Sequence, residues 1–201
     1  PRRDPPIEVR RIAVERPSRF AADVTGDTLN RASWYDGRTV TVLDKEHNVY
    51  AVIEAPATID ATLQKLEDEY GVVLPLADLL YADPYAVLMA GVTYGRYLGI
   101  HQAVGVACHH LAFSQPTIEW QVWIDAGERP LPRKLVISYV DEPGEPQYSA
   151  TIRRFTLDVP VPAGLFTFEP PEGAQRIDAR DMKRSEDGDP APPETTPKGG
   201  M

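Results

Sequence analysis

The chain has 201 residues, 42% of them hydrophobic and 25% charged, which is the composition of a globular protein with one core and a tail. Its formal net charge of −9 disfavours nucleic acid as a partner, because the phosphate backbone would be repelled. A membrane-spanning segment is excluded as well, since the longest apolar-rich region, residues 74–89, is interrupted by Asp78, Asp83 and Pro84.

The first fifty residues show the signals of short strands and tight turns. Residues 7–15 are rich in β-branched side chains, and Phe20, Ala22 and Val24 alternate with polar neighbours in the next run. Asp36-Gly37 is a hairpin-turn signal between two further runs. The pattern then continues through residues 39–43 and 49–53. Successive short strands with short turns predict antiparallel pairing.

A helical insert interrupts the strands at residues 58–90. Its first part has helical spacing at Ile59, Leu63, Leu66 and Tyr70. Thr58 is the expected N-cap and Gly71 the expected stop. A second helical stretch is predicted over residues 76–82, and Asp83-Pro84 is typical of the start of a third, which would end near Ala90.

Strand signals return after Gly91 and last until the chain becomes polar. Five runs are divided by turns, at residues 92–103, 105–114, 118–125, 132–140 and 147–157. Residues 166–168 and 174–179 are shorter candidates for strands. Residues 180–201 have almost nothing apolar to bury, so we expect a disordered tail there.

The predicted fold class is therefore α+β and mainly β. About ten strands would form one curved antiparallel sheet, an incomplete β-barrel, whose concave face is covered by short helices. Residues 1–179 would form a single domain, with residues 58–90 as a helical lid over the sheet.

Several segments resemble a family of predicted periplasmic bacterial proteins of unknown function. They are residues 35–41 (YDGRTVT), 74–80 (LPLADLL), 108–113 (CHHLAF), 119–124 (EWQVWI) and 131–135 (LPRKL). The ending at residues 166–174 (FTFEPPEGA) is similar to the close of the wider lipoprotein-localisation superfamily, the LolA- and LolB-like carriers. The string from Cys108 to Ile124 is the most specific of these pieces.

This resemblance implies a half-barrel with an apolar concave side that short helices close. In the carriers, that cavity receives the acyl chains of lipoproteins. The resemblance also implies a periplasmic location, and because the chain begins at Pro1 we expect any signal peptide to lie upstream. The family usually has a helix ahead of its first strand, which would be trimmed or lacking in this chain.

The motif with the best residue types for metal binding or nucleophilic catalysis is Cys108-His109-His110. On a strand, Cys108 and His110 share one face and His109 takes the other, so at most two of the three could meet one ion. Zinc needs about four ligands, or three and a water, and neither His47 nor His101 is spaced as a ligand partner. We therefore expect no metal and no cofactor. The interpretation that fits best is a buried apolar-like cysteine with hydrogen-bonded histidines; a polar contact of His109 or His110 at a cavity edge stays open.

The apolar stripes have two interpretations, a core or the lining of a pocket. The candidate lining residues are Leu79, Leu80, Leu88 and Met89 in the helical insert and Trp120, Val122 and Ile124 on one strand face. If the helices pack tightly on the sheet there is only a core; if they stand off there is a pocket.

These observations favour a non-enzymatic binding protein that holds a lipid, an acylated protein or another hydrophobic ligand between sheet and lid, as a carrier or sensor. The alternative is a ligand-free envelope protein that docks a protein partner in assembly or regulation. A hydrolase that uses Cys108 or a histidine is disfavoured, because neighbouring residues of a strand point apart and no catalytic motif is present.

Overall fold

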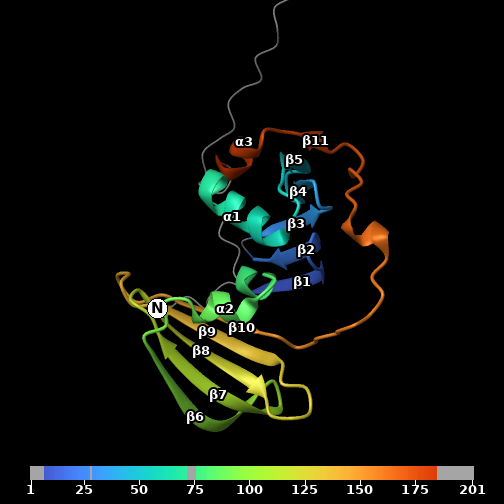
Figure 1. Ribbon diagram of the computed structural model, residues 1–201. Helices are drawn as coiled ribbons and strands as arrows, with labels where there is room; N and C mark the ends of the chain where they lie inside the picture. The colour runs from blue at the N-terminus through green and yellow to red at the C-terminus, as the bar shows by residue number, and fades with distance from the viewer. Residues whose placement is uncertain (1–6, 28, 72–75, 185–201) are drawn as a thin grey trace, which may run out of the picture. The chain divides into compact units, whose positions relative to one another are not determined.

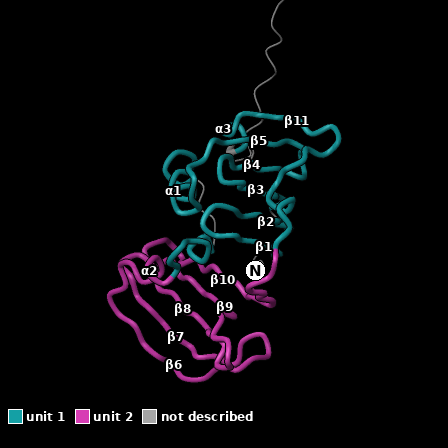
Figure 2. Tube along the Cα trace, turned by 45° about the vertical axis from the view of Figure 1, so that its right-hand side comes forward, with its two compact units in different colours: residues 1–84, 161–201 teal, residues 85–160 magenta. Residues whose placement is uncertain are grey.

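The computed structural model describes residues 7–27, 29–71 and 76–184, and the chain is divided into two compact units. The first unit comprises the chain up to Pro84 and from Val161 onward, and the second comprises Tyr85–Pro160 (Figure 2). The first unit is therefore discontinuous in sequence, since the second lies within it along the chain.

The first unit contains a six-stranded sheet in the order β1-β2-β3-β4-β5-β11 (Figure 1). Its strands are β1 (Glu8–Glu15), β2 (Arg19–Gly26), β3 (Asn30–Tyr35), β4 (Thr39–Asp44), β5 (Val49–Glu54) and β11 (Gln175–Arg176). The first five form an antiparallel meander, whereas the short β11 pairs with β5 in parallel.

One row of large side chains crosses this sheet and forms the centre of its core. Phe20 of β2 lies opposite Tyr35 of β3, Tyr35 opposite Val40 of β4, and Val40 opposite Ile53 of β5. Their exposed fractions are 1%, 0%, 1% and 7% in that order. Helix α1 packs on this row through three buried residues, Ile59, Leu63 and Leu66.

Helix α1 (Ile59–Tyr70) has the ends that the sequence predicts. Thr58 is in an extended conformation and its side chain accepts a hydrogen bond from the Ala61 amide, which would otherwise lack a partner in the first turn. Gly71 adopts the left-handed conformation at φ 63°, which glycine tolerates better than any other residue. The helix is thus set by local chemistry at both ends and by one apolar face between them.

Replacing Thr58 by alanine should lower the free energy of unfolding by about 1 kcal/mol, because the Ala61 amide loses its acceptor. Urea denaturation followed by far-ultraviolet circular dichroism measures this loss. Thr58→Ser keeps the hydroxyl group and should stay close to the wild type. An alanine variant with an unchanged midpoint would show that the cap does not stabilise α1.

The opposite face of the first sheet is covered by the C-terminal part of the same unit. The 3-10 helix η2 (Ala163–Phe166) ends in Phe166, which is 1% exposed and lies under the Arg19 guanidinium. Phe168 follows, with its ring 5.0 Å from that of Trp34 and 4.9 Å from that of Tyr50. Figure 1 shows this segment and α1 on opposite sides of the sheet.

Hydrogen bonds hold residues 79–82, which follow α1 in the chain, to the rest of the first unit. Only one turn of 3-10 helix, η1 (Ala77–Leu79), forms where a helix over residues 76–82 was predicted. Arg16 donates to the carbonyl oxygens of Leu79 and Tyr81, and Asp60 accepts from the Ala82 amide. Leu80 is buried in the core under α1.

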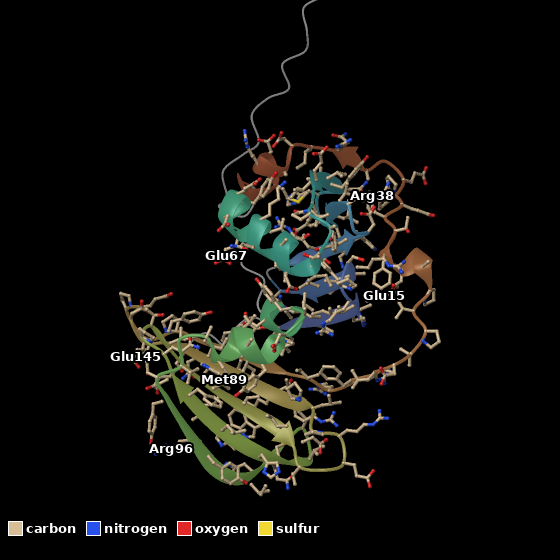
Figure 3. The ribbon with its side chains drawn as sticks, viewed as in Figure 1. Glu15, Arg38, Glu67, Met89, Arg96 and Glu145 are labelled. Atoms are coloured by element: carbon tan, nitrogen blue, oxygen red, sulfur yellow. The ribbon has the colours of Figure 1, made fainter. Side chains whose placement is uncertain are left out.

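The second unit contains a five-stranded antiparallel sheet in the order β10-β9-β8-β7-β6. Its strands are β6 (Tyr94–Ala103), β7 (Val106–Ser114), β8 (Ile118–Asp125), β9 (Pro132–Tyr139) and β10 (Gln147–Thr151). They follow α2 (Pro84–Met89), which lies over this sheet in Figure 1. Figure 3 marks Met89 in α2 and Arg96 on the edge strand β6.

The predicted class, α+β and mainly β, is confirmed, but the strands form two sheets where one was expected. The division has a local cause. The free edge of β5, where a continuing meander would add its next strand, is taken by β11. The insert at residues 58–90 is divided too, because α1 and Leu80 pack in the first unit while α2 precedes the second sheet.

The remaining differences concern the last strands and the tail. The strand predicted over residues 147–157 ends at Thr151, and residues 163–166 form a 3-10 helix. Where a tail from residue 180 was expected, α3 (Ala179–Arg184) forms and buries Met182 to 6% exposure. The rest of the expected tail, residues 185–201, lies outside the described residues.

Candidate functional site

One face of the second sheet is almost entirely apolar. Its registered rows run Phe113–Trp120–Ile137 and Leu111–Val122–Leu135 across β7, β8 and β9, and Ile124 extends the face on β8. We call these seven residues the apolar face. Trp120 and Leu135 are 5% and 7% exposed, while the other five are half-buried.

The apolar face becomes more exposed toward the edge strand β6. Tyr97 lies opposite Leu111 and Ile100 lies opposite His109, on the same side of the sheet. Tyr97 is 55% and Ile100 51% exposed, in contrast to the buried Trp120 two strands away. The face therefore offers an open apolar margin at β6 that leads to a buried interior over β8 and β9.

Helix α2 is small compared with the second sheet. Six residues of helix are about 9 Å long, whereas five strands are about 19 Å wide and an eight-residue strand is about 26 Å long. Val87, Leu88 and Met89 are half-buried, and the helix is tied to the end of β7 by the Gln115 amide, which donates to the carbonyl oxygens of Leu88 and Ala90.

A polar pair stands at the exposed margin. The hydroxyl group of Tyr97 lies 3.0 Å from Nδ1 of His109, and their rings are tilted toward one another with centroids 5.8 Å apart. Both side chains are exposed. His109 is thus an exposed polar group beside an apolar surface, hydrogen-bonded as the interpretation favoured from the sequence expected.

His110 points to the opposite face of the same strand and is 7% exposed. Its ring stacks on Trp123 at a centroid distance of 3.9 Å, and its Nε2 lies 2.9 Å from Oε1 of Gln121. Its Nδ1 lies 2.7 Å from Nδ1 of His101. On the far side of Trp123, the ammonium group of Lys134 lies 4.7 Å from the ring centroid. We call His101 and His110 the histidine pair.

The pair suits a proton and not a metal ion. The ring centroids of His101 and His110 are 4.9 Å apart, and their Nδ1 atoms are 2.7 Å apart. The first distance is close to the second plus the radii of the two rings, so the two Nδ1 atoms point at one another. An ion in line between them would need two bonds of about 2.0 Å each, for which there is no room. Within residues 7–27, 29–71 and 76–184, no three His, Cys, Asp or Glu side chains are grouped as metal ligands.

Cys108 lies on the histidine-pair face and is completely buried. Burial, and the nearby carboxylate of Asp125, raise the pKa of its thiol, so the sulfur stays protonated and weakly nucleophilic at neutral pH. The Asp125 carboxylate accepts hydrogen bonds from the Gly127 amide and from Arg133. These bonds hold the pKa of Asp125 below its usual range. Cys108 and His109 point to opposite faces, as expected.

The residues proposed from the sequence as a pocket lining are divided by the structure. Leu80 belongs to the core of the first unit, and Leu79 lies half-buried in η1 beside it. Trp120, Val122 and Ile124 share one face of the second sheet. Leu88 and Met89 belong to that same unit. The sequence indicated no partner for His101, and it is the register set by the short turn between β6 and β7 that brings this residue to His110.

The first unit also has an open depression between β5, the end of α1 and residues 176–180. Val52 and Tyr70 line it together with Arg176 and Arg180, and its lining is mostly polar. It is therefore unlike an acyl-chain pocket, which is lined by apolar side chains. Every helix in the described part of the chain is too short or too polar to span a membrane.

Comparison with known proteins agrees with the location expected from the sequence. Among curated proteins none matches the chain significantly. A family model described as "Predicted periplasmic protein (DUF2092)" matches residues 7–179, which include both sheets, α1, α2 and the histidine pair. That description confirms the periplasmic assignment. Because the match covers most of the chain, the protein belongs to this family of predicted periplasmic proteins.

Proposed function

We propose that this protein is a non-enzymatic periplasmic binding protein that takes up an acyl chain on the apolar face of its second sheet, next to α2. The observation that supports this is the gradient of exposure across one face, from Tyr97 and Ile100 at the margin to Trp120 and Leu135 at the interior. An acyl chain gains about 0.8 kcal/mol for each methylene group that it buries, so such a surface attracts it.

The exposed margin suits the polar end of an amphiphile. A chain that enters over β6 would leave its head group near the hydroxyl group of Tyr97 and the ring of His109, which are exposed and bonded to one another. The resemblance to lipoprotein carriers points to the same ligand class. No bond is made or broken in this function, in keeping with the buried, protonated thiol of Cys108.

The test is a binding measurement on the full chain. Gently purified protein should carry lipid in native mass spectrometry, and delipidated protein should bind a fluorescent C16 fatty acid that unlabelled palmitate displaces. Protein that is free of lipid after gentle purification, and that does not bind the probe after delipidation, would refute the proposal.

A second function, a ligand-free envelope interaction protein, is favoured by the first unit. There the helix side is filled: Phe20, Tyr35 and Ile59 are each at most 1% exposed, which leaves no space for a ligand under α1. Cross-linking in cell envelopes would test this function. A defined complex formed by lipid-free protein would support it over acyl binding, and the absence of any cross-linked partner would count against it.

A further inference from the structure

The histidine pair adds a side-chain contact to the backbone pairing of two neighbouring strands of the second sheet. His101 lies on β6 directly opposite Cys108 of β7, and His110 is the next β7 residue on the same face. The two nitrogens that meet, at 2.7 Å, belong to different strands, so the state of this contact bears on how β6 is held to β7.

The number of protons that the contact can hold follows from its geometry. With Oε1 of Gln121 as acceptor, Nε2 of His110 carries a hydrogen, and in the neutral ring Nδ1 is then an acceptor for Nδ1–H of His101. One added proton is tolerated, because His110 can become the donor while His101 moves its hydrogen to Nε2. A second proton leaves a hydrogen on both facing nitrogens, and the contact must break.

The surroundings disfavour positive charge at this point. By the strand register, the charged and titratable groups that share this face with His110 are Tyr94, Arg96 and His101 of β6, Cys108 of β7, Glu119 and Asp125 of β8, and Arg133 and Lys134 of β9. Asp125 is already bonded to Arg133. Burial has the largest effect and lowers the pKa of His110; the bond to Gln121 acts against it, and the nearby charges of His101 and Lys134 lower the pKa further.

We propose that the histidine pair is an acid-sensing site, which holds the end of β6 next to the β6–β7 turn close to β7 while it carries at most one extra proton and loosens that end when it takes up a second. Because β6 is the edge strand and also carries the exposed margin of the apolar face, loosening of this end changes the surface on the other side of the sheet. The inference itself rests on the pair and does not require the proposed acyl ligand.

The direction in which the stability of the protein changes with pH follows from the lowered pKa of His110. The folded protein binds this proton less tightly than the unfolded chain does, so the unfolded chain takes it up first as the pH falls. The contribution of neutral His110 to the free energy of unfolding is fully present above about pH 6.5, the ordinary pKa of histidine. It is lost as the pH falls through that value and then through the lower pKa of the folded state.

Cys108 provides a reporter within the site. It is the only cysteine of the chain, is 0% exposed, and lies opposite His101. Labelling by 4,4′-dithiodipyridine, which reacts with thiols at acidic pH, measures its protection in the full-length protein. From about pH 7.5 to about pH 5 the wild-type rate, divided by that of free cysteine at the same pH, should rise several-fold, because a loosened β6 no longer covers the sulfur.

Two variants separate the pair from general acid effects. In His101→Gln the amide can donate to or accept from His110, so protonation no longer breaks the contact and the rate should change less than about twofold. In His47→Gln, which removes an exposed histidine of the first unit, the acid response of Cys108 labelling should match that of the wild type. A flat wild-type rate, or an equal rise in His101→Gln, would overturn the proposal.

Nitrogen-15 NMR of the histidine rings in the wild type gives a second measurement that needs no variant. At about pH 7.5 the ring of His110 should carry its hydrogen on Nε2 and not on Nδ1, and its nitrogen signals should titrate below the ordinary pKa of histidine. A hydrogen on Nδ1 of His110 at that pH, or titration of His110 at the ordinary pKa, would refute the arrangement whatever the labelling shows.

Discussion

Phe20→Ala should lower the free energy of unfolding by about 3–5 kcal/mol, which is the range for removing a buried aromatic ring from a core. Phe20 is 1% exposed and begins the row that continues through Tyr35, with their ring centroids 5.4 Å apart. The same row supports α1. The substitution therefore leaves a cavity beneath a helix that cannot collapse freely, because Thr58 and Gly71 fix its ends.

Urea denaturation, with the slope of the transition compared between variants, measures this loss. Tyr85→Ala is the matched control, since this aromatic residue is 73% exposed and its removal should change the free energy of unfolding by no more than about 0.5 kcal/mol. If Phe20→Ala cost as little as the control, α1 would be a loosely held cover and not part of a filled core.

Val122→Glu should weaken binding of the fluorescent fatty acid by tenfold or more, provided that the acyl chain lies on the apolar face. Val122 is the central residue of the row Leu111–Val122–Leu135. A carboxylate there would have to lose its hydration whenever an acyl chain covered it. The cost exceeds the 1.4 kcal/mol that corresponds to a factor of ten in affinity. Fluorescence titration of the delipidated variant gives the change.

Gln121→Glu introduces the same side chain at the neighbouring residue of β8, whose side chain points to the other face and is also half-buried. This variant should bind the fatty acid like the wild type. Circular dichroism at the temperature of the titration confirms that both variants are folded. Equal binding by Val122→Glu and the wild type would place the ligand elsewhere.

The sequence predicted best the features that depend on neighbouring residues. The extent of α1 follows from helical spacing, from a hydroxyl cap at Thr58 and from a glycine at the stop. All three lie within one stretch of chain, so no distant contact was needed to find them. The hairpins of the first sheet were likewise found from turn residues such as Asp36, whose carboxylate accepts from the Arg38 and Thr39 amides.

Features that depend on distant contacts were not predictable from the pattern. The division into two sheets follows from the pairing of β11 with β5, two segments that are far apart in sequence. Helix α3 was missed because its stretch is charged, and one buried side chain, Met182, is its only strongly apolar feature. Neither pairing nor burial of this kind leaves a periodic signal in the sequence.

The histidine pair was missed for a different reason. Two residues, Val104 and Gly105, turn the chain between β6 and β7, and both have positive φ, 52° and 75°. The break between the predicted strands at residue 104 was found, but a β-branched residue is an outlier in this conformation, so Val104 did not indicate a two-residue turn and the register of the hairpin stayed unassigned. With that register, His101 and His110 would have been placed on one face from the sequence alone.

The discontinuity of the first unit has a consequence for the order in which the protein forms. The second unit is one uninterrupted stretch with hairpin connections between successive strands, so its contacts close short loops. The first unit must wait for Phe166, Phe168 and β11, which come from the far end of the chain. A chain that emerges from its amino terminus would therefore expose the outer face of its first sheet, with Trp34 and Tyr50, until residues 163–176 have also been synthesised or translocated. During that interval Trp34 and Tyr50 are the aromatic side chains that we expect a chaperone to contact.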